Sequence, residues 1–248
     1  HSALFRQARC ATNMDKKELA IKKYNRIVHS NAKSSIAPIS EYNMAILMYE
    51  TNDKRAKKHF KKIIKKYPTS DYAIASNYYL GVIEIASPQK NEKKIAKSQA
   101  KALIFFKTYL EQAPDGRFAI KSIDEIKKLN VKLTNYDNLL IAKSYYANGE
   151  YTKSKEYLNK TTLAESWSDF AKNEYKLGNK EKSNYYAEMG LTKHAANTSE
   201  KDVFEIVDNY IATFPTRKEG IEKLVNMKLN STGADYVAYL NCNEVVAT

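Results

Sequence analysis

The sequence contains few of the residues that form tight turns: seven glycines and five prolines among 248 residues. Their combined share is less than half of the roughly 12% usual in soluble proteins. Because tight turns and phosphate-binding loops depend on these residues, the composition disfavours an all-β sandwich, a collagen and a glycine-rich nucleotide-binding fold. The apolar share of 43% is large enough for a substantial core. We therefore expect a folded, helix-rich chain.

Signatures of metal, membrane and catalytic sites are also scarce. The four histidines and two cysteines lack the C-x-x-C, H-x-x-x-H and H-E-x-x-H spacings of metal sites. No apolar run approaches the roughly 20 residues that a membrane-spanning helix needs. The phosphate-loop pattern G-x-x-x-x-G-K-S/T, the dinucleotide pattern G-x-G-x-x-G and the nucleophile pattern G-x-S-x-G do not occur. The sequence therefore predicts no cofactor, no metal and no catalytic residue.

Four segments share one helical pattern. They start at Tyr24, Phe60, Phe106 and Val207, place apolar residues three and four positions later, and reach an alanine or proline eight positions on. This spacing is typical of a helix with one apolar face, followed by a breaker. In the first three segments, an alanine four positions before the aromatic residue lets a neighbouring helix approach closely.

A second pattern occurs at 142–158 and again at 171–187: a small residue, aromatic side chains, a glycine, a small residue and an apolar residue, in register. This order predicts a helical hairpin, in which Gly149 and Gly178 adopt the positive φ of a helix C-terminus. The helix that contains SNYYLG is likewise expected to end at Gly81.

These patterns resemble the tetratricopeptide repeat (TPR) family, through 142–158 and through small-x-x-x-Phe-x₇-Pro at 56–68 and 102–114. The phrase KKYPTSDYAIASNYYLG (65–81) is most similar to repeats of bacterial envelope proteins: outer-membrane-assembly lipoproteins, division coordinators, flagellar-motor scaffolds and lytic transglycosylases. The resemblance implies an all-α solenoid of about 12–14 helices in hairpins, wound as a right-handed superhelix. It also implies a non-catalytic scaffold for protein–protein interactions, in the bacterial periplasm or associated with the envelope.

The resemblance further implies a concave groove, lined by the first helix of each hairpin, that binds another protein or peptide. The positions that match the ligand-facing ones of the family are Tyr42, Tyr49, Tyr78, Lys143, Tyr146, Lys172 and Tyr175. Tyrosine suits such a surface because it combines a stiff apolar ring with a hydroxyl that water or a partner can satisfy. The alternative is that these tyrosines pack between helices, as aromatic residues at helical spacing often do.

Charge is distributed unevenly along the chain. Residues 1–133 carry 27 Lys and Arg against 12 Asp and Glu, a net charge of +15, whereas residues 134–248 carry 14 against 16, a net charge of −2. We expect two domains with this boundary, one of basic and one of near-neutral TPR-like repeats, joined near 130–136. The second ends in ADYVAYLNCNEVVAT, which reads as the first helix of a further repeat, so we expect the natural chain to continue past Thr248.

Part of the positive charge is predicted to form one basic helix face, made by Lys57, Lys58, Lys61, Lys62, Lys65 and Lys66. The simplest interpretation is a solvated helix surface. The alternative is that this face binds an acidic partner, anionic lipid or nucleic acid. The affinity of the protein for nucleic acid would then fall with added salt. Sequence-specific reading of nucleic acid is disfavoured because only six of the 41 basic residues are arginine.

A second functional hypothesis also remains open at this point. The chain would be the helical accessory region of a cell-wall lytic transglycosylase, with the catalytic domain outside these residues. Glu165 and Ser166 match the pair that opens the catalytic motif of that family, but WSDFAKNEYKLG follows in place of a glycine-rich segment. Glu165 is therefore expected to begin a repeat helix.

Overall fold

The computed structural model describes residues 2–30, 34–86, 91–162, 166–193 and 199–247. Within these ranges the regular elements are fourteen α-helices and no strands, which confirms the all-α prediction. The chain divides into two compact units, His1–Lys132 (unit 1) and Leu133–Thr248 (unit 2), and each is described by itself.

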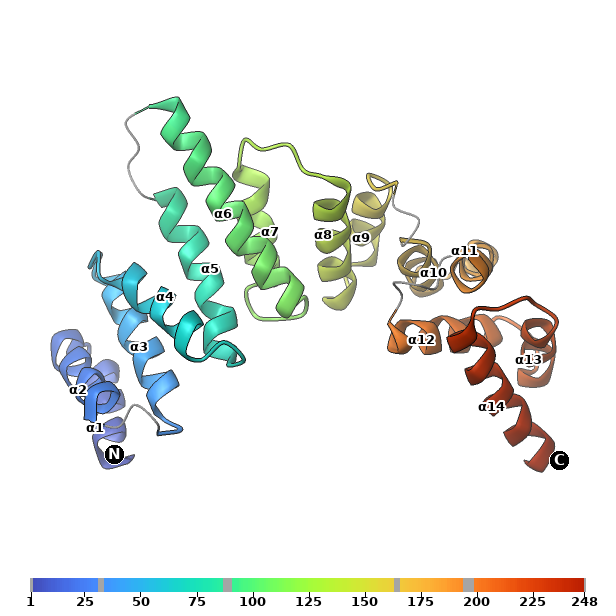
Figure 1. Cartoon of the computed structure of the whole chain (residues 1–248), viewed down its shortest axis with the longest axis horizontal. Coiled ribbons are helices and arrows are strands. Elements are labelled where there is room, and N and C mark those ends of the chain that lie inside the picture. Colours follow the sequence, from blue (N-terminus) through green and yellow to red (C-terminus); the bar gives the residue numbers. More distant parts are fainter. Residues whose placement is uncertain (1, 31–33, 87–90, 163–165, 194–198, 248) are drawn as a thin grey trace. The chain divides into compact units, whose positions relative to one another are not determined.

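Unit 1 consists of helical hairpins. Its helices are α1 (Ser2–Asn13), α2 (Lys17–Ser30), α3 (Ala37–Glu50), α4 (Ala56–Lys66), α5 (Asp71–Ala86), α6 (Glu92–Gln112) and α7 (Ala119–Lys128). The pairs α1 with α2, α3 with α4 and α5 with α6 pack together, and α2 and α4 also contact the hairpin that follows (Figure 1). Each hairpin therefore buries its apolar surface against the next one, as expected of a helical-hairpin solenoid.

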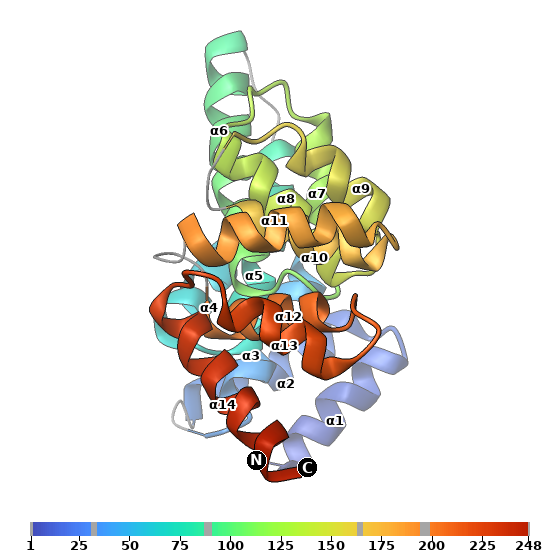
Figure 2. The same ribbon diagram turned by 90° about the vertical axis from the view of Figure 1, so that its right-hand side faces the viewer.

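Unit 2 repeats this arrangement. Its helices are α8 (Asn135–Ala147), α9 (Tyr151–Leu158), α10 (Trp167–Lys176), α11 (Lys180–Lys193), α12 (Glu200–Ile211), α13 (Arg217–Val225) and α14 (Ser231–Ala247). Helices α10 and α11 form one of its hairpins and lie side by side (Figure 2). Helix α10 also contacts α9 and α12, and α14 packs on α12 and α13.

Most helix ends follow from local sequence. Helix α4 ends at Lys66, two residues before Pro68, because proline cannot continue a helix. Thr134 starts α8 with a capping box, in which its hydroxyl accepts from the Asp137 amide and the Asp137 carboxylate accepts from the Thr134 amide. The glycines Gly149 and Gly178 have φ angles of +77° and +80°, which confirms the prediction for the turns after α8 and α10.

Gly81 differs from this pattern, and the prediction that its helix ends there was wrong. Helix α5 continues to Ala86, and Gly81 lies buried within it. A Cβ atom at this position would lie 2.5 Å from Cε1 of Phe106 on α6. The glycine therefore allows the Phe106 ring to pack against the α5 backbone, at the cost in helix propensity that an internal glycine carries.

Candidate functional site

The residues predicted to line a groove lie on the first helices of hairpins. They are Tyr42 and Tyr49 on α3, Tyr78 on α5, Lys143 and Tyr146 on α8, and Lys172 and Tyr175 on α10. The structure places them in two groups with different chemistry, one in each unit.

In unit 1 the group is aromatic. We use the name aromatic ladder for Tyr42, Tyr49, Tyr78, Tyr79 and Phe118. Tyr79 is its centre, with ring centroids 6.2 Å from Tyr42, 5.4 Å from Tyr49 and 5.3 Å from Tyr78. The Tyr78 and Phe118 rings stack face to face, with centroids 4.4 Å apart and planes 2° apart. The ladder thus connects α3, α5 and the residue that precedes α7.

The members of the aromatic ladder differ in exposure. Tyr42 is only 8% exposed and also contacts the buried ring of Phe60, so it contributes to the core. Burial, together with the nearby Tyr79 hydroxyl, raises the pKa of Tyr42 well above its usual value and keeps the phenol neutral. Tyr49, Tyr78 and Tyr79 are half-buried and leave part of each ring accessible. A role in partner binding for Tyr42, Tyr49 and Tyr78 stays a prediction.

One end of the aromatic ladder is cationic. The Arg117 guanidinium lies 4.5 Å from the Phe118 ring centroid, and the Lys121 ammonium lies 5.9 Å from it. The Tyr109 hydroxyl accepts a hydrogen bond of 3.0 Å from the Phe118 backbone N–H and so holds this residue in place. Phe118 is only 3% exposed, so the accessible groups at this end are the two exposed cations, which suit an acidic side chain of a bound segment.

Two lysines of the predicted basic face pair with carboxylates of neighbouring helices. Lys57 Nζ lies 2.7 Å from Glu84 Oε1 on α5, and Lys62 Nζ lies 2.7 Å from Glu41 Oε1 on α3. Glu41 is fully buried, and His59 Nδ1 lies 3.3 Å from the same oxygen. Burial favours the neutral acid, but His59 and Lys62 outweigh it and lower the pKa of Glu41. Lys57 and Lys62 therefore help to join α4 to its neighbours.

The other four lysines of this face, Lys58, Lys61, Lys65 and Lys66, are exposed. Lys66 Nζ lies 5.1 Å from the centroid of the Tyr67 ring. Within the described ranges, Lys58, Lys61 and Lys65 have no carboxylate at ion-pair distance. These exposed lysines are available to attract an anionic surface, and that role stays a prediction.

In unit 2 the group is charged. We use the name polar network for a set of six side chains on α8, α10 and α12: Lys143, Tyr146, Asp169, Lys172, Asp202 and Glu205. At its centre, Lys172 Nζ lies 3.5 Å from Asp169 Oδ1 and donates a hydrogen bond to Asp202 Oδ1. Lys143 Nζ lies 3.5 Å from Asp169 Oδ2. These contacts link the first helices of three consecutive hairpins.

Burial makes the charges of this network interdependent. The Lys172 side chain is 7% exposed, which disfavours its charge, but Asp169 and Asp202 outweigh this effect and raise the pKa of Lys172. Burial also works against a charged Asp202, yet Lys172 lowers the pKa of that carboxyl. Burial raises the pKa of Asp169, against the opposing effect of Lys172 and Lys143. The Lys172 ammonium therefore stays charged inside the unit.

The outer part of the polar network involves Tyr146 and Lys143. The Tyr146 hydroxyl donates a hydrogen bond of 2.5 Å to Glu205 Oε1, and the Lys172 ammonium lies 5.3 Å from the Tyr146 ring centroid. Burial and the Glu205 carboxylate both raise the pKa of Tyr146, so the phenol remains a donor. Lys143 is the most accessible cation of the network, with 44% of its side chain exposed.

The structure brings Lys143, Tyr146 and Lys172 together. Tyr175 is apart from them: it is half-buried, and within the described part of the chain its side chain makes no hydrogen bond or ring contact, although its backbone carbonyl accepts from the Gly178 N–H. The sequence-based reasoning missed the acidic partners on α10 and α12. A signal was present in the spacing, because Asp169 lies three residues before Lys172, and Asp202 and Glu205 are three residues apart.

Two further observations concern other classes of site. The described ranges contain no group of three or more His, Cys, Asp or Glu side chains arranged to hold a metal ion. None of the described helices combines the length and apolarity needed to span a membrane. Glu165, which matched the first residue of the transglycosylase motif, lies outside the described residues.

Comparison with known proteins finds a similarity in the N-terminal hairpins. No curated protein matches the chain. A solved tetratricopeptide repeat protein from Parabacteroides merdae is similar to it, with a TM-score of 0.39, 11% sequence identity, and coverage of 96% of this chain and 97% of that one. The family model "Tetratricopeptide repeat" matches residues 2–34 and 40–70. The two matched ranges cover the hairpins of α1 with α2 and of α3 with α4, which are therefore similar to tetratricopeptide repeats.

Proposed function

We propose that this protein is a non-catalytic scaffold that binds a partner protein or peptide through the first helices of its hairpins. The observation that carries the proposal is the aromatic ladder of unit 1. Tyr49, Tyr78 and Tyr79 come from two consecutive hairpins, contact one another and remain partly accessible. Half-buried tyrosines held in place by neighbouring rings offer contact area with little loss of side-chain entropy on binding.

Charge favours a partner with acidic groups. The aromatic ladder ends at Arg117 and Lys121, and it belongs to the unit that carries the net charge of +15. Exposed lysines on α4 add to the positive field and would accelerate the approach of an acidic segment. We place the scaffold in a bacterial cell-envelope assembly, such as the outer-membrane, division or flagellar-motor machinery. The support for this location is the resemblance of residues 65–81 to envelope repeats.

The proposal is tested by capture from separate envelope and cytosolic extracts of bacteria. The baits are the unchanged chain, the double variant Tyr49→Ala/Tyr78→Ala and the control Tyr185→Ala, which removes a tyrosine 57% exposed on the second helix α11. We expect the unchanged chain and the control to capture the same envelope protein, and the double variant to lose it while keeping its helical circular dichroism.

Two results would contradict the proposal. Equal capture by all three baits would remove the aromatic ladder as the binding surface. A partner found only in the cytosolic extract would remove the envelope location and leave the scaffold function in place.

A further inference from the structure

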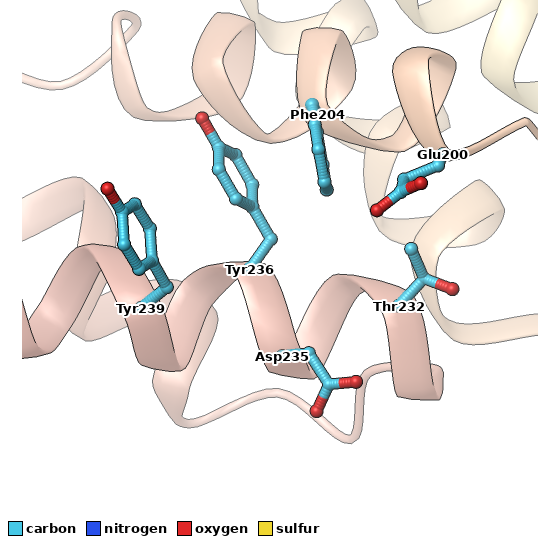
Figure 3. Close-up of a pocket in the computed structure, with 6 residues that line it drawn as sticks. All are labelled: Glu200, Phe204, Thr232, Asp235, Tyr236 and Tyr239. Atoms are coloured by element: carbon cyan, nitrogen blue, oxygen red, sulfur yellow. The ribbon is translucent and has the colours of Figure 1, made fainter.

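A cleft of about 490 Å³ lies between α12 and α14 of unit 2, away from the residues that the repeat pattern singles out. Its lining is shown in Figure 3 and consists of Glu200, Phe204, Thr232, Asp235, Tyr236 and Tyr239. The lining combines an aromatic surface with carboxylates, and each part has a defined geometry.

The aromatic surface is a row of three rings. The Phe204 and Tyr236 rings stack with centroids 4.1 Å apart and planes 26° apart. The Tyr239 ring follows, 6.4 Å from Tyr236 and within 14° of parallel. The Tyr236 hydroxyl lies 3.2 Å from both carboxylate oxygens of Asp208, to which it donates, so the middle ring is fixed. Tyr239 is 63% exposed and presents its ring to solvent.

The charged groups that line the cleft are both acidic, although the chain carries a net charge of +13. Glu200 and Asp235 are exposed, and neither has an ion-pair or hydrogen-bond partner within the described part of the chain. Figure 3 shows the Glu200 carboxylate on the α12 side of the cleft, facing Thr232 at the start of α14. The Asp235 carboxylate lies at the edge of the cleft and points away from the rings in Figure 3. An unpaired carboxylate beside accessible aromatic rings is a complementary environment for an organic cation.

We propose that this cleft binds the guanidinium group of an arginine side chain on a partner protein. A guanidinium is planar and stacks on an aromatic face while its fork of N–H groups donates to a carboxylate. A lysine ammonium is a more strongly hydrated point charge and cannot stack in the same way. This site lies on a different unit from the aromatic ladder and does not rest on the function proposed for it.

The proposal is tested with the peptide GRGRG-amide, labelled with fluorescein at its N-terminus, by fluorescence anisotropy with the full chain at low salt. Residues 134–248 carry a net charge of −2, so general attraction of a cationic peptide to this unit is weak and is measured by the control pair of carboxylates described below. Loss of the two carboxylates in Glu200→Gln/Asp235→Asn is expected to weaken binding about tenfold or more, as for a charge-assisted hydrogen bond. Tyr239→Ala is expected to weaken it several-fold, and a peptide with lysine in place of arginine should bind more weakly.

Matched controls are available in the same unit. Glu156→Gln/Glu181→Gln makes the same change in net charge on exposed residues of α9 and α11, and Tyr185→Ala removes an equally exposed ring. Both should leave the affinity unchanged, and circular dichroism should be the same for all variants.

Three results would overturn the proposal. They are undetectable binding of the arginine peptide, equal weakening by the control pair, and equal affinity for the lysine peptide. Self-association of the unchanged chain, abolished by Glu200→Gln/Asp235→Asn, would instead assign the cleft to a second copy.

Discussion

Unit 1 and unit 2 use the same hairpin architecture but differ in the side chains that link their first helices, which are rings between α3 and α5 and charged groups between α8, α10 and α12. In unit 1 the helices meet through rings, including the fully buried Phe60 and Phe106. In unit 2, helix α10 buries three consecutive polar residues: Lys172 faces α12, Asn173 donates a hydrogen bond of 2.5 Å to Ser154, and Glu174 lies 2.7 Å from Lys155. The same hairpin architecture can therefore be held together by different side-chain chemistry.

This difference has consequences for stability and for binding. Ring contacts depend on area and shape, tolerate changes in pH and leave partly exposed aromatic surface for a partner. A buried ionic network gains little net free energy because desolvation opposes the attraction, but loss of one partner leaves an uncompensated charge. We expect loss of a ring to matter most in unit 1 and loss of a buried cation to matter most in unit 2, while the buried carboxylate of Glu41 also makes unit 1 sensitive to acid.

The largest effect is expected for Phe106→Ala in unit 1. Removal of this fully buried ring, which packs on Gly81, should lower the free energy of unfolding by about 3–5 kcal/mol. Denaturant unfolding measures the loss, and hydrogen exchange assigns it to the helices that open more easily. Increased exchange in α8–α14 equal to that in α1–α7 would show that the two units do not differ in this way.

The next largest effect is expected for Lys172→Met in unit 2. It removes the cation paired with Asp202, leaves Asp169 with Lys143 alone, and should cost about 2–3 kcal/mol, less than for a fully buried pair because Asp202 is 27% exposed. The control Lys143→Met removes a cation that is 44% exposed and should cost about 0.5 kcal/mol or less. Equal losses in the two variants would show that burial of Lys172 does not matter.

Substitution of a glycine by alanine should also change stability differently in the two units, by a smaller amount. Gly81→Ala in unit 1 brings a Cβ against the Phe106 ring and should cost about 1–3 kcal/mol through overpacking. Gly149→Ala in unit 2 meets no atom within 4 Å and should cost about 1 kcal/mol, only through its positive φ. A second substitution, Phe106→Leu, should reduce the cost of Gly81→Ala and leave that of Gly149→Ala unchanged. Equal coupling to both glycines would contradict this interpretation.

The smallest expected effect is the loss of stability of each unit at acidic pH. Because the folded pKa of Glu41 is below its ordinary value of 4.5, unit 1 should lose stability as the pH falls from about 5 through that folded pKa. In unit 2 the lowered pKa of Asp202 acts in the same direction, but the raised pKa of Asp169 acts against it. Hydrogen exchange at pH 5 and pH 3.5 should therefore show a larger loss in unit 1. Glu41→Gln should remove most of that loss, and an unchanged pH dependence in this variant would contradict the assignment.

The sequence was a good guide to helices and a weaker guide to contacts between them. The breaker at Pro68 and the positive φ at Gly149 are local properties, and both were predicted correctly. The prediction for Gly81 was wrong because a glycine is needed there to make room for the Phe106 ring, which lies 25 residues further along the chain. An internal glycine and a terminal one look alike until the packing of the next helix is known.

At the candidate site, too, the positions of residues along their helices were predictable and their contacts with other helices were not. Repeat register placed Lys143, Tyr146 and Lys172 on first helices, but it did not reveal their partners on α12, where Asp202 lies 30 positions after Lys172. The burial of Tyr42 depends on rings from α4 and α5, and the cleft between α12 and α14 joins residues more than thirty positions apart. Such groupings depend on the tertiary packing of hairpins, which periodicity does not specify.

Binding through the first helices is tested most directly by hydrogen exchange of the full chain, with and without the partner captured from the envelope extract. We expect the partner to protect α3 and α5, including the segments around Tyr49 and Tyr78, and α4 and α6 to exchange as before. Protection confined to α4 and α6 would contradict it, because the partner would then bind the second helices.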